Sequence, residues 1–212
     1  TYATWVFYYF LEKSHGVDIH RQIYTAMENR HPYDAIDAVV TGGLKKQWPL
    51  YTVKEWNQLT TEESFLEWDA FAIEPFEAVH VPLKVKPILI GPRGDFQDRL
   101  TTDLRPLTRK YLAYSVEPGA DVRSFSVEMG HWYQKDKIAL KALVQYSGSK
   151  GWKVEDWNDQ REDRELCLDK ADERIRKVVL IYSHFGFQPG PVETIQIRVK
   201  ATNLGCHAYR GN

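Results

Sequence analysis

The sequence predicts an α+β protein in which a helical segment, residues 1–76, is followed by an antiparallel β-sandwich domain, residues 77–212, of jelly-roll or Ig-like type. Apolar residues recur at helical spacing as far as Pro75, whereas from Ala78 onward short apolar runs alternate with turn residues. About seven to nine such runs at regular spacing favour a sandwich. With 43% hydrophobic and 13% aromatic residues, 212 residues are enough to form a real core.

Capping and breaking residues divide the helical segment. Gly16 is a natural C-cap, Asp18 a natural N-cap, and Pro32 stops the second helix. Thr52 and Thr60 each open a capping-box pattern. The helices expected on this basis span residues 1–16, 18–31, 34–43, 52–56 and 60–75.

The second part predicts strands separated by polar loops. Two prolines, Pro82 and Pro87, indicate an edge or a bulge in the first strand region, and the segment GPRGDFQDR (91–99) is expected to be a loop. Residues 117–121 are expected to be a turn between two strands, and the long runs within 175–206 predict a closing hairpin. The expected strands cover residues 78–90, 107–116, 122–129, 138–146, 152–157, 165–168 and the two arms of 175–206.

Charge and hydropathy exclude some classes of partner. The net charge is −1 and Lys and Arg are scattered, which argues against nucleic acid or an anionic membrane as the main partner. No apolar run is long enough to cross a bilayer. Residue 1 is Thr, and the first residues read as the interior of a helix, so we expect a mature product or a fragment of a longer protein.

The two cysteines, Cys167 and Cys206, fit one disulfide in an oxidising compartment; the alternative is two buried free thiols in a cytosolic protein. Both lie beside strand-like segments rather than inside them, which favours the disulfide. Such a bond would close a loop of about 40 residues, worth about 4 kcal/mol in the chain-entropy model.

Catalytic and nucleotide-binding motifs are absent from the sequence. It contains no His-Glu-x-x-His, no Gly-x-Ser-x-Gly elbow and no Walker loop, and the adjacent pair Cys206 and His207 would point in opposite directions on an extended chain. Glu12 and His15 are three residues apart on a predicted helix, a spacing that surface residues share by chance. We therefore predict no catalytic residue, no metal ligand and no cofactor.

Two weaker signals lie in the loop after residue 90. Arg93-Gly94-Asp95 could present a guanidinium and a carboxylate to an adhesion receptor, although three-residue matches arise easily by chance. Asp95, Asp98 and Asp103 offer hard oxygen ligands for calcium, but their spacing matches no known calcium loop, which favours solvated turn acids.

Aromatic residues at strand ends give the candidate binding residues. Trp132, Tyr133, Trp152 and Trp157 are placed where exposed rings could stack on sugars or contact a protein. The alternative is that these rings close the ends of the sandwich as part of its core.

Three segments resemble secreted gluzincin-type metallopeptidase-like proteins. They are TWVFYYFLE (4–12) with Gly16 and IHRQIY (19–24), the segment LCLD (166–169), and the tail NLGCHAYRG (203–211). In that family, helices downstream of the zinc-binding His-Glu-x-x-His are followed by a β-sandwich. The zinc motif itself is not in this sequence, so the resemblance carries over no ligand or base.

The resemblance implies a non-catalytic C-terminal region of a secreted zinc-peptidase-like protein, which supports the fold or positions the substrate. Its partner would be the missing N-terminal catalytic-type domain. An alternative is an extracellular carbohydrate- or protein-binding sandwich module that uses edge aromatics. A third is an enzyme with scattered Asp and Glu residues as acid and base.

Overall fold

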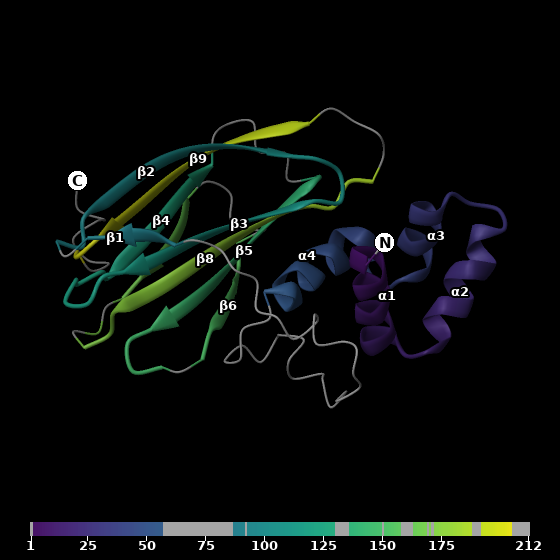
Figure 1. Ribbon diagram of the computed structural model, residues 1–212, viewed down its shortest axis with the longest axis horizontal. Coiled ribbons are helices and arrows are strands. Elements are labelled where there is room, and N and C mark those ends of the chain that lie inside the picture. The colour runs from purple at the N-terminus through teal and green to yellow at the C-terminus, as the bar shows by residue number, and fades with distance from the viewer. Residues whose placement is uncertain are drawn as a thin grey trace.

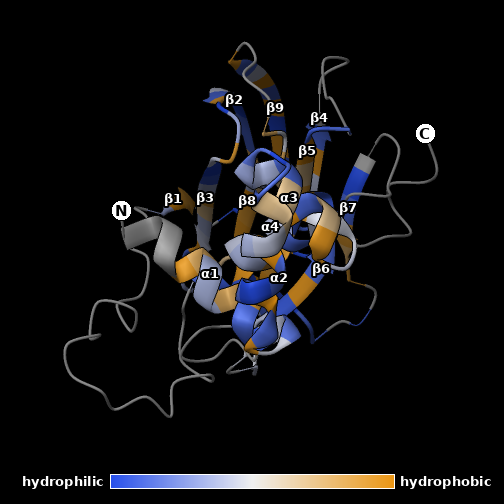
Figure 2. Cartoon of the chain, turned by 90° about the vertical axis from the view of Figure 1, so that its right-hand side faces the viewer, coloured by the Kyte–Doolittle hydropathy of each residue, from blue (hydrophilic) through white to orange (hydrophobic). Residues whose placement is uncertain are grey.

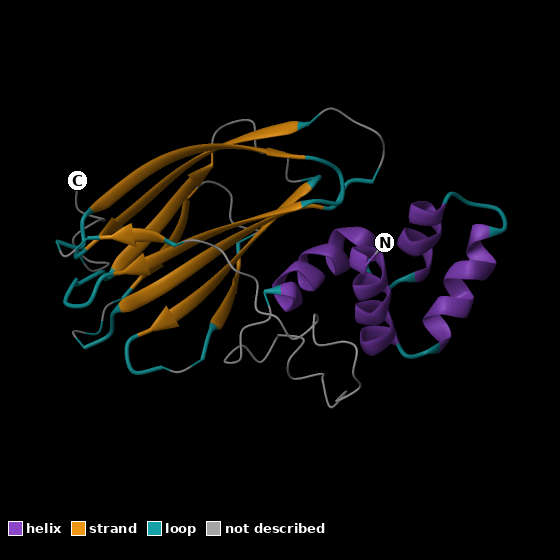
Figure 3. Cartoon of the chain, in the orientation of Figure 1, coloured by secondary structure: helices purple, strands orange, loops and turns teal. Residues whose placement is uncertain are grey.

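The computed structural model describes residues 2–56, 87–91, 93–129, 136–149, 151–157, 163–168, 170, 172–187 and 192–204. Helices come first and strands follow, as the sequence predicts (Figures 1 and 3). The helices are α1 (Tyr2–His15), α2 (Asp18–Met27), α3 (Pro32–Val39) and α4 (Gly43–Glu55). The strands are β1 (Ile88–Ile90), β2 (Phe96–Leu104), β3 (Arg109–Val116), β4 (Ser124–Met129), β5 (Ile138–Tyr146), β6 (Lys153–Asp156), β7 (Asp163–Cys167), β8 (Ile175–His184) and β9 (Glu193–Thr202).

The described strands form two sheets, ordered β1-β3-β8-β5-β6 and β2-β9-β4-β7. Eight of them make one long antiparallel ribbon, because β2 pairs with β9, β3 with β8, β4 with β7 and β5 with β6. The ribbon folds over on itself through the pairs β4–β9 and β5–β8. This is the jelly-roll order, which decides between the two sandwich types that the sequence predicts. The short β1 adds a parallel edge beside β3.

The main core lies between the two sheets. Its largest side chains include Tyr114, Phe125 and Trp157, all at most 1% exposed. Inward residues alternate with outward polar ones along β9, as expected for a strand with one solvated face.

The five-stranded sheet is instead buried on both faces. Seven consecutive residues of β5 and the last seven of β8 are buried. The second face is covered by α4, whose Val53 and adjoining Trp56 pack on Leu143, Val179 and Ile181. The middle sheet therefore lies between α4 and the outer sheet, and Figure 2 looks onto the molecule from the helical side.

The helical part has its own core, which packs at the start of β5 and the end of β8 (Figure 1). Phe10, Leu11 and Ile23 pack with residues of α3 and α4 and with Ala139 and Phe185 of the sandwich. None of the helices in the described part of the chain is long and apolar enough to cross a membrane.

Several helix boundaries differ from the expected ones. Gly16 ends α1 as predicted, with a φ of 87°. Pro32 begins α3 rather than stopping α2, because a proline at the first helical position loses no hydrogen bond. Gly42, at φ 80°, precedes α4. That helix runs through Pro49, so the short helix expected from Thr52 is the last turn of a longer one.

The closing hairpin is also corrected. β8 and β9 do not pair with each other, because they belong to different sheets and the loop between them crosses from one to the other. The same holds for β3 and β4, which the turn at 117–121 joins. β2 begins at Phe96, inside the segment expected to be a loop. The helix expected at 60–75 and most of the strand region expected at 78–90 lie outside the described residues.

Trp157→Ala should destabilise the protein by about 3–5 kcal/mol, because it removes a fully buried ring and leaves a cavity between the sheets. Trp152→Ala, which removes a half-buried ring on the helix-covered face, should cost less, about 1–2 kcal/mol. Urea unfolding followed by circular dichroism measures both. Equal losses for the two variants would contradict this placement of the core.

Candidate ligand-binding site

The site lies where α4 meets the middle sheet, and buried polar contacts hold this junction. The hydroxyls of Thr52 on α4 and Ser183 on β8 are 2.7 Å apart and both fully buried. Tyr111 on β3 donates its hydroxyl proton to the carbonyl oxygen of Thr52 at 2.8 Å. These bonds fix the position of α4 along the sheet.

A charged pair lies beside these contacts. The Arg109 guanidinium on β3 donates to the Glu55 carboxylate at the end of α4. The Tyr111 hydroxyl, which shares its one proton between the Thr52 carbonyl and this carboxylate, lies 3.0 Å from the carboxylate, and Tyr51 donates to it at 3.3 Å. Burial acts to lower the pKa of Arg109, but the charge of Glu55, its hydrogen bond and the nearby Tyr111 and Tyr51 together outweigh burial and raise the pKa overall. Burial, with the nearby Glu55 charge, raises the pKa of Tyr111 well above its usual value.

A pocket of about 470 Å³ opens next to this pair, within the size range of small-ligand sites. Its residues come from α1, α3, α4, the turn before α3, and the start of β3 with its preceding loop. Arg109 contributes the charged group. The remaining walls are the aromatic and imidazole rings of Phe7, Tyr8, His31, Tyr33 and Trp48 and the aliphatic side chains of Pro32, Ile36, Leu44 and Leu107.

The aromatic walls are held by contacts with one another. The rings of Phe7 and Trp48 meet edge to face with centroids 5.3 Å apart. At the rim, the ring centroid of Tyr33 lies 5.5 Å from that of His31 and 6.2 Å from that of Phe187. Burial, followed by the proximity of two other tyrosines, raises the pKa of Tyr8. Tyr33 is 39% exposed, so its ring is accessible to a ligand.

The loop between β2 and β3 forms another wall and has a strained backbone. Leu107 has a φ of 52°, a conformation that branched and bulky residues rarely adopt. Its amide donates to the carbonyl of Gly186 at 3.2 Å, and the Thr108 hydroxyl donates to the Arg105 carbonyl at 2.6 Å. The surrounding bonds therefore hold the loop in the shape that places Leu107 in the pocket.

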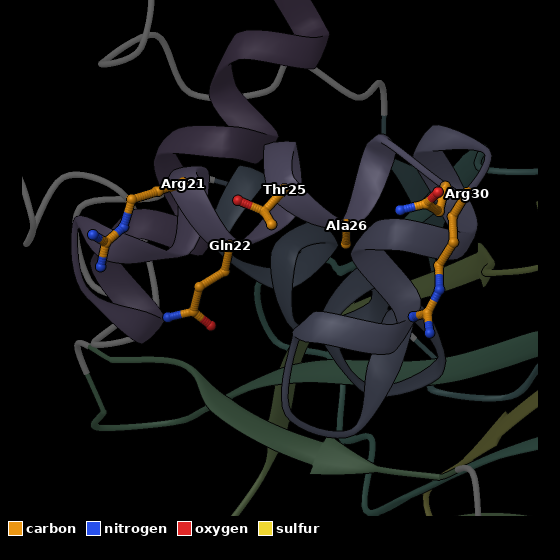
Figure 4. Close-up of a pocket in the computed structure, with 6 residues that line it drawn as sticks. Arg21, Gln22, Thr25, Ala26 and Arg30 are labelled. Atoms are coloured by element: carbon orange, nitrogen blue, oxygen red, sulfur yellow. The ribbon is translucent and has the colours of Figure 1, made fainter.

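A second hollow, of about 610 Å³, runs along α2 and the turn after it (Figure 4). Arg21 and Arg30 lie at its two ends, with Thr25 and Ala26 between them. The lining side chains apart from the half-buried Ala26 are exposed, and Arg21 is paired with Asp18 at 3.2 Å. Its lining residues other than Ala26 are polar or charged and no aromatic ring is among them, which makes it the weaker candidate.

Within the described residues, no group of three or more His, Cys, Asp or Glu side chains could hold a metal ion. Glu12 bonds to His20 of α2 at 2.8 Å rather than sharing a ligand face with His15. His184, buried on β8, accepts a bond from the Gly186 amide at 3.1 Å. Burial lowers its pKa, although Glu193 acts in the opposite direction.

The four aromatic residues predicted for binding are not all placed together. Trp157 is 1% exposed and belongs to the core between the sheets, so it cannot stack on a surface ligand, and that expectation is corrected. Trp152 is half-buried and meets Trp56 edge to face at 6.2 Å, on the helix-covered face. Trp132 and Tyr133 lie outside the described residues.

The structure also places the Arg-Gly-Asp tripeptide and two of the aspartates considered as calcium ligands. Gly94, between the exposed Arg93 and Asp95, is buried with φ 74°, and a side chain there would collide with the Asp121 carbonyl oxygen at 2.5 Å. Asp98 and Asp103 lie on β2 with an odd spacing, so they point to opposite faces of the sheet. They do not converge on a calcium ion.

No described cysteine is a free thiol, and Cys167, at the end of β7, is disulfide-bonded. Cys206 lies outside the described residues. Ser124 of β4 is opposite both Cys167 and Thr202, so the chain leading to Cys206 leaves the sheet two strands from Cys167. The pairing of Cys167 with Cys206 stays a prediction.

Sequence reasoning missed the pocket because its residues read as core or as surface. Phe7 and Trp48 fit buried helix faces, and Arg109 is separated by 54 residues from its partner Glu55. One usable signal was the segment His31-Pro32-Tyr33, which places a ring on each side of a proline at a helix boundary.

Comparisons of the chain with protein-family models, with curated proteins and with solved structures found no match. The resemblance to gluzincin-type proteins therefore stays a prediction.

Removing the Tyr111 hydroxyl should change the alkaline stability. A tyrosine whose pKa is raised on folding stabilises the fold fully below its unfolded value, near 10, and this stability is lost as the pH rises above it. Tyr111→Phe should cost about 1 kcal/mol at pH 7 and should reduce the loss above pH 10 by up to about 1.4 kcal/mol per pH unit. Urea unfolding at pH 7 to 11 measures this, with the exposed Tyr24→Phe as control. An unchanged slope in Tyr111→Phe would contradict it.

The disulfide can be tested by thiol counting. The denatured, unreduced protein should show no reactive thiol, and Cys167→Ser should lower the free energy of unfolding by about 2–4 kcal/mol. Two reactive thiols in the parent protein would refute the pairing.

Proposed function

We propose that this chain is a non-catalytic extracellular module that binds a neutral carbohydrate in the pocket between the helices and the sandwich. The observation that carries the proposal is the pocket itself, about 470 Å³ with aromatic walls and one guanidinium beside them. Apolar rings with a few placed polar groups are the usual composition of a small-ligand site.

The charge balance of the site favours a neutral ligand over an anionic one. Arg109 is the charged residue of the pocket wall, and its guanidinium is already paired with Glu55. A ligand carboxylate would have to compete with that pair, whereas a sugar hydroxyl can accept from a remaining guanidinium N–H without breaking it. The hydroxyls of Tyr8 and Tyr33 offer further hydrogen bonds to a polyhydroxyl ligand.

The rings at the rim supply the stacking surface. Tyr33 is exposed, and its ring contacts the rings of Phe187 and His31. A ring that is fixed in position loses little freedom on binding, so its stacking contributes directly to affinity. The disulfide bond of Cys167 is typical of proteins in an oxidising compartment, and this supports a secreted module that meets glycans.

Tyr33→Ala should weaken oligosaccharide binding at least about tenfold, which corresponds to the loss of about 1.4 kcal/mol. A glycan array identifies the ligand, and calorimetry measures its affinity for the parent and the variant. Tyr146→Ala is the matched control, because this half-buried tyrosine ends β5 at the end of the strand away from Ala139 and the helical core. It should bind as the parent does.

Two outcomes would count against the proposal. Absence of binding to any neutral glycan would reject the carbohydrate, and an unchanged affinity in Tyr33→Ala would reject the pocket. Binding of an apolar peptide in place of a glycan, again lost in Tyr33→Ala, would assign the pocket to a protein ligand.

A further inference from the structure

The outer face of the four-stranded sheet carries a second feature, which is independent of the pocket. The inner residues of β2 and β9 pack into the core, so the alternate residues point away from it. On these two strands the outward side chains are all polar or charged: Gln97, Arg99, Thr101, Asp103, Thr194, Gln196, Arg198, Lys200 and Thr202.

Two arginines occupy directly opposed positions on this face. The register pairs Arg99 of β2 with Arg198 of β9, and the next outward residue of β9 is Lys200. Like charges directly opposite one another across two strands destabilise the sheet. A neutral or acidic residue in place of either arginine would raise the free energy of unfolding, so the arginine pair lowers the stability of the fold.

Of the three acidic groups on the described part of this face, Glu128 alone forms ion pairs with any of the three cations. Glu128 of β4 accepts from both Arg198, at 2.7 Å, and Lys200, at 3.1 Å. Burial acts to raise the pKa of Glu128, and these two cations outweigh it and lower the pKa overall. Asp103 and Glu165 accept from the hydroxyls of Thr194 and Ser124 instead, at 2.7 and 3.2 Å.

The guanidinium groups therefore have unused donors. Arg99 is exposed and forms no ion pair with a described residue. The side chain of Arg198 is 40% exposed, and its ion pair with Glu128 uses Nη1, which leaves Nη2 without an acceptor among the described residues. An arginine fork binds a planar or tetrahedral oxyanion through two parallel bonds, and two adjacent forks can hold one oxyanion between them.

We propose that Arg99 and Arg198 form a binding site for an oxyanion carried by an acidic saccharide, such as a sulfate ester. The amides and hydroxyls of Gln97, Thr101 and Gln196 surround the pair on the same face and suit the hydroxyls of a sugar chain. Nucleic acid is disfavoured, because the outward positions of β2 and β9 carry no aromatic ring on which a base could stack.

The test uses a sulfated oligosaccharide, its desulfated form and inorganic sulfate, with calorimetry at low ionic strength. The sulfated form should bind, the desulfated form should not bind at this face, and Arg99→Gln should weaken binding at least tenfold. Arg30→Gln is the matched control, since it removes the same charge from the turn after α2 and should leave the affinity unchanged. Tyr33→Ala should also leave it unchanged, which separates this site from the pocket.

Arg99→Gln should remain folded and be at least as stable as the parent in urea, because it removes a like-charge contact. Parent-like affinity in Arg99→Gln would overturn the proposal. Inorganic sulfate that binds as tightly as the sulfated oligosaccharide would reject the saccharide as the ligand.

Discussion

The middle sheet of this protein must be covered on both faces, and the rest of the structure follows from that need. Seven consecutive residues of β5 are buried, so neither face of that strand can be left to water. The outer sheet covers one face, and α4 with Trp56 covers the other. Because α4 is fixed to the sheet through Thr52 and Ser183, the helices that pack on α4 are positioned as well.

This arrangement explains why the candidate pocket lies where it does. α4 covers the outward face of the middle sheet, and the pocket opens at the margin of this contact, where the loop that leads into β3 and the turn before α3 contribute its walls. The pair of Glu55 and Arg109 lies at this margin and is shielded on one side by Tyr111. Two exposed charges would contribute little here, whereas a partly buried pair with two tyrosine donors also fixes the shape of the pocket floor.

Local patterns in the sequence predicted where strands begin and end better than they predicted which strands pair. The strand expected at 138–146 has those limits, since alternation and flanking turns are local properties. The hairpin expected within 175–206 was wrong, because which sheet a strand joins depends on residues far away: β8 pairs with β3 and β5, and β9 with β2 and β4. Trp157 shows the same limit, since its position at a strand end did not reveal that both sheets enclose it. The pocket could not be predicted for a related reason, because it joins Phe7, Tyr33 and Arg109 from separate elements.

The pairing of the first and last strands of the ribbon has a consequence for how the chain folds. Phe96 lies opposite Ala201, so the outer sheet cannot form until nearly the whole chain is available. Closing such a long loop is slow, because its entropy is lost before its contacts are gained. During synthesis, the helices can form early, yet the apolar side of α4 stays uncovered until β5 and β8 have paired. The nascent chain therefore passes through a stage in which apolar surfaces that become buried later are exposed to solvent. Assistance by a chaperone would matter most at that stage.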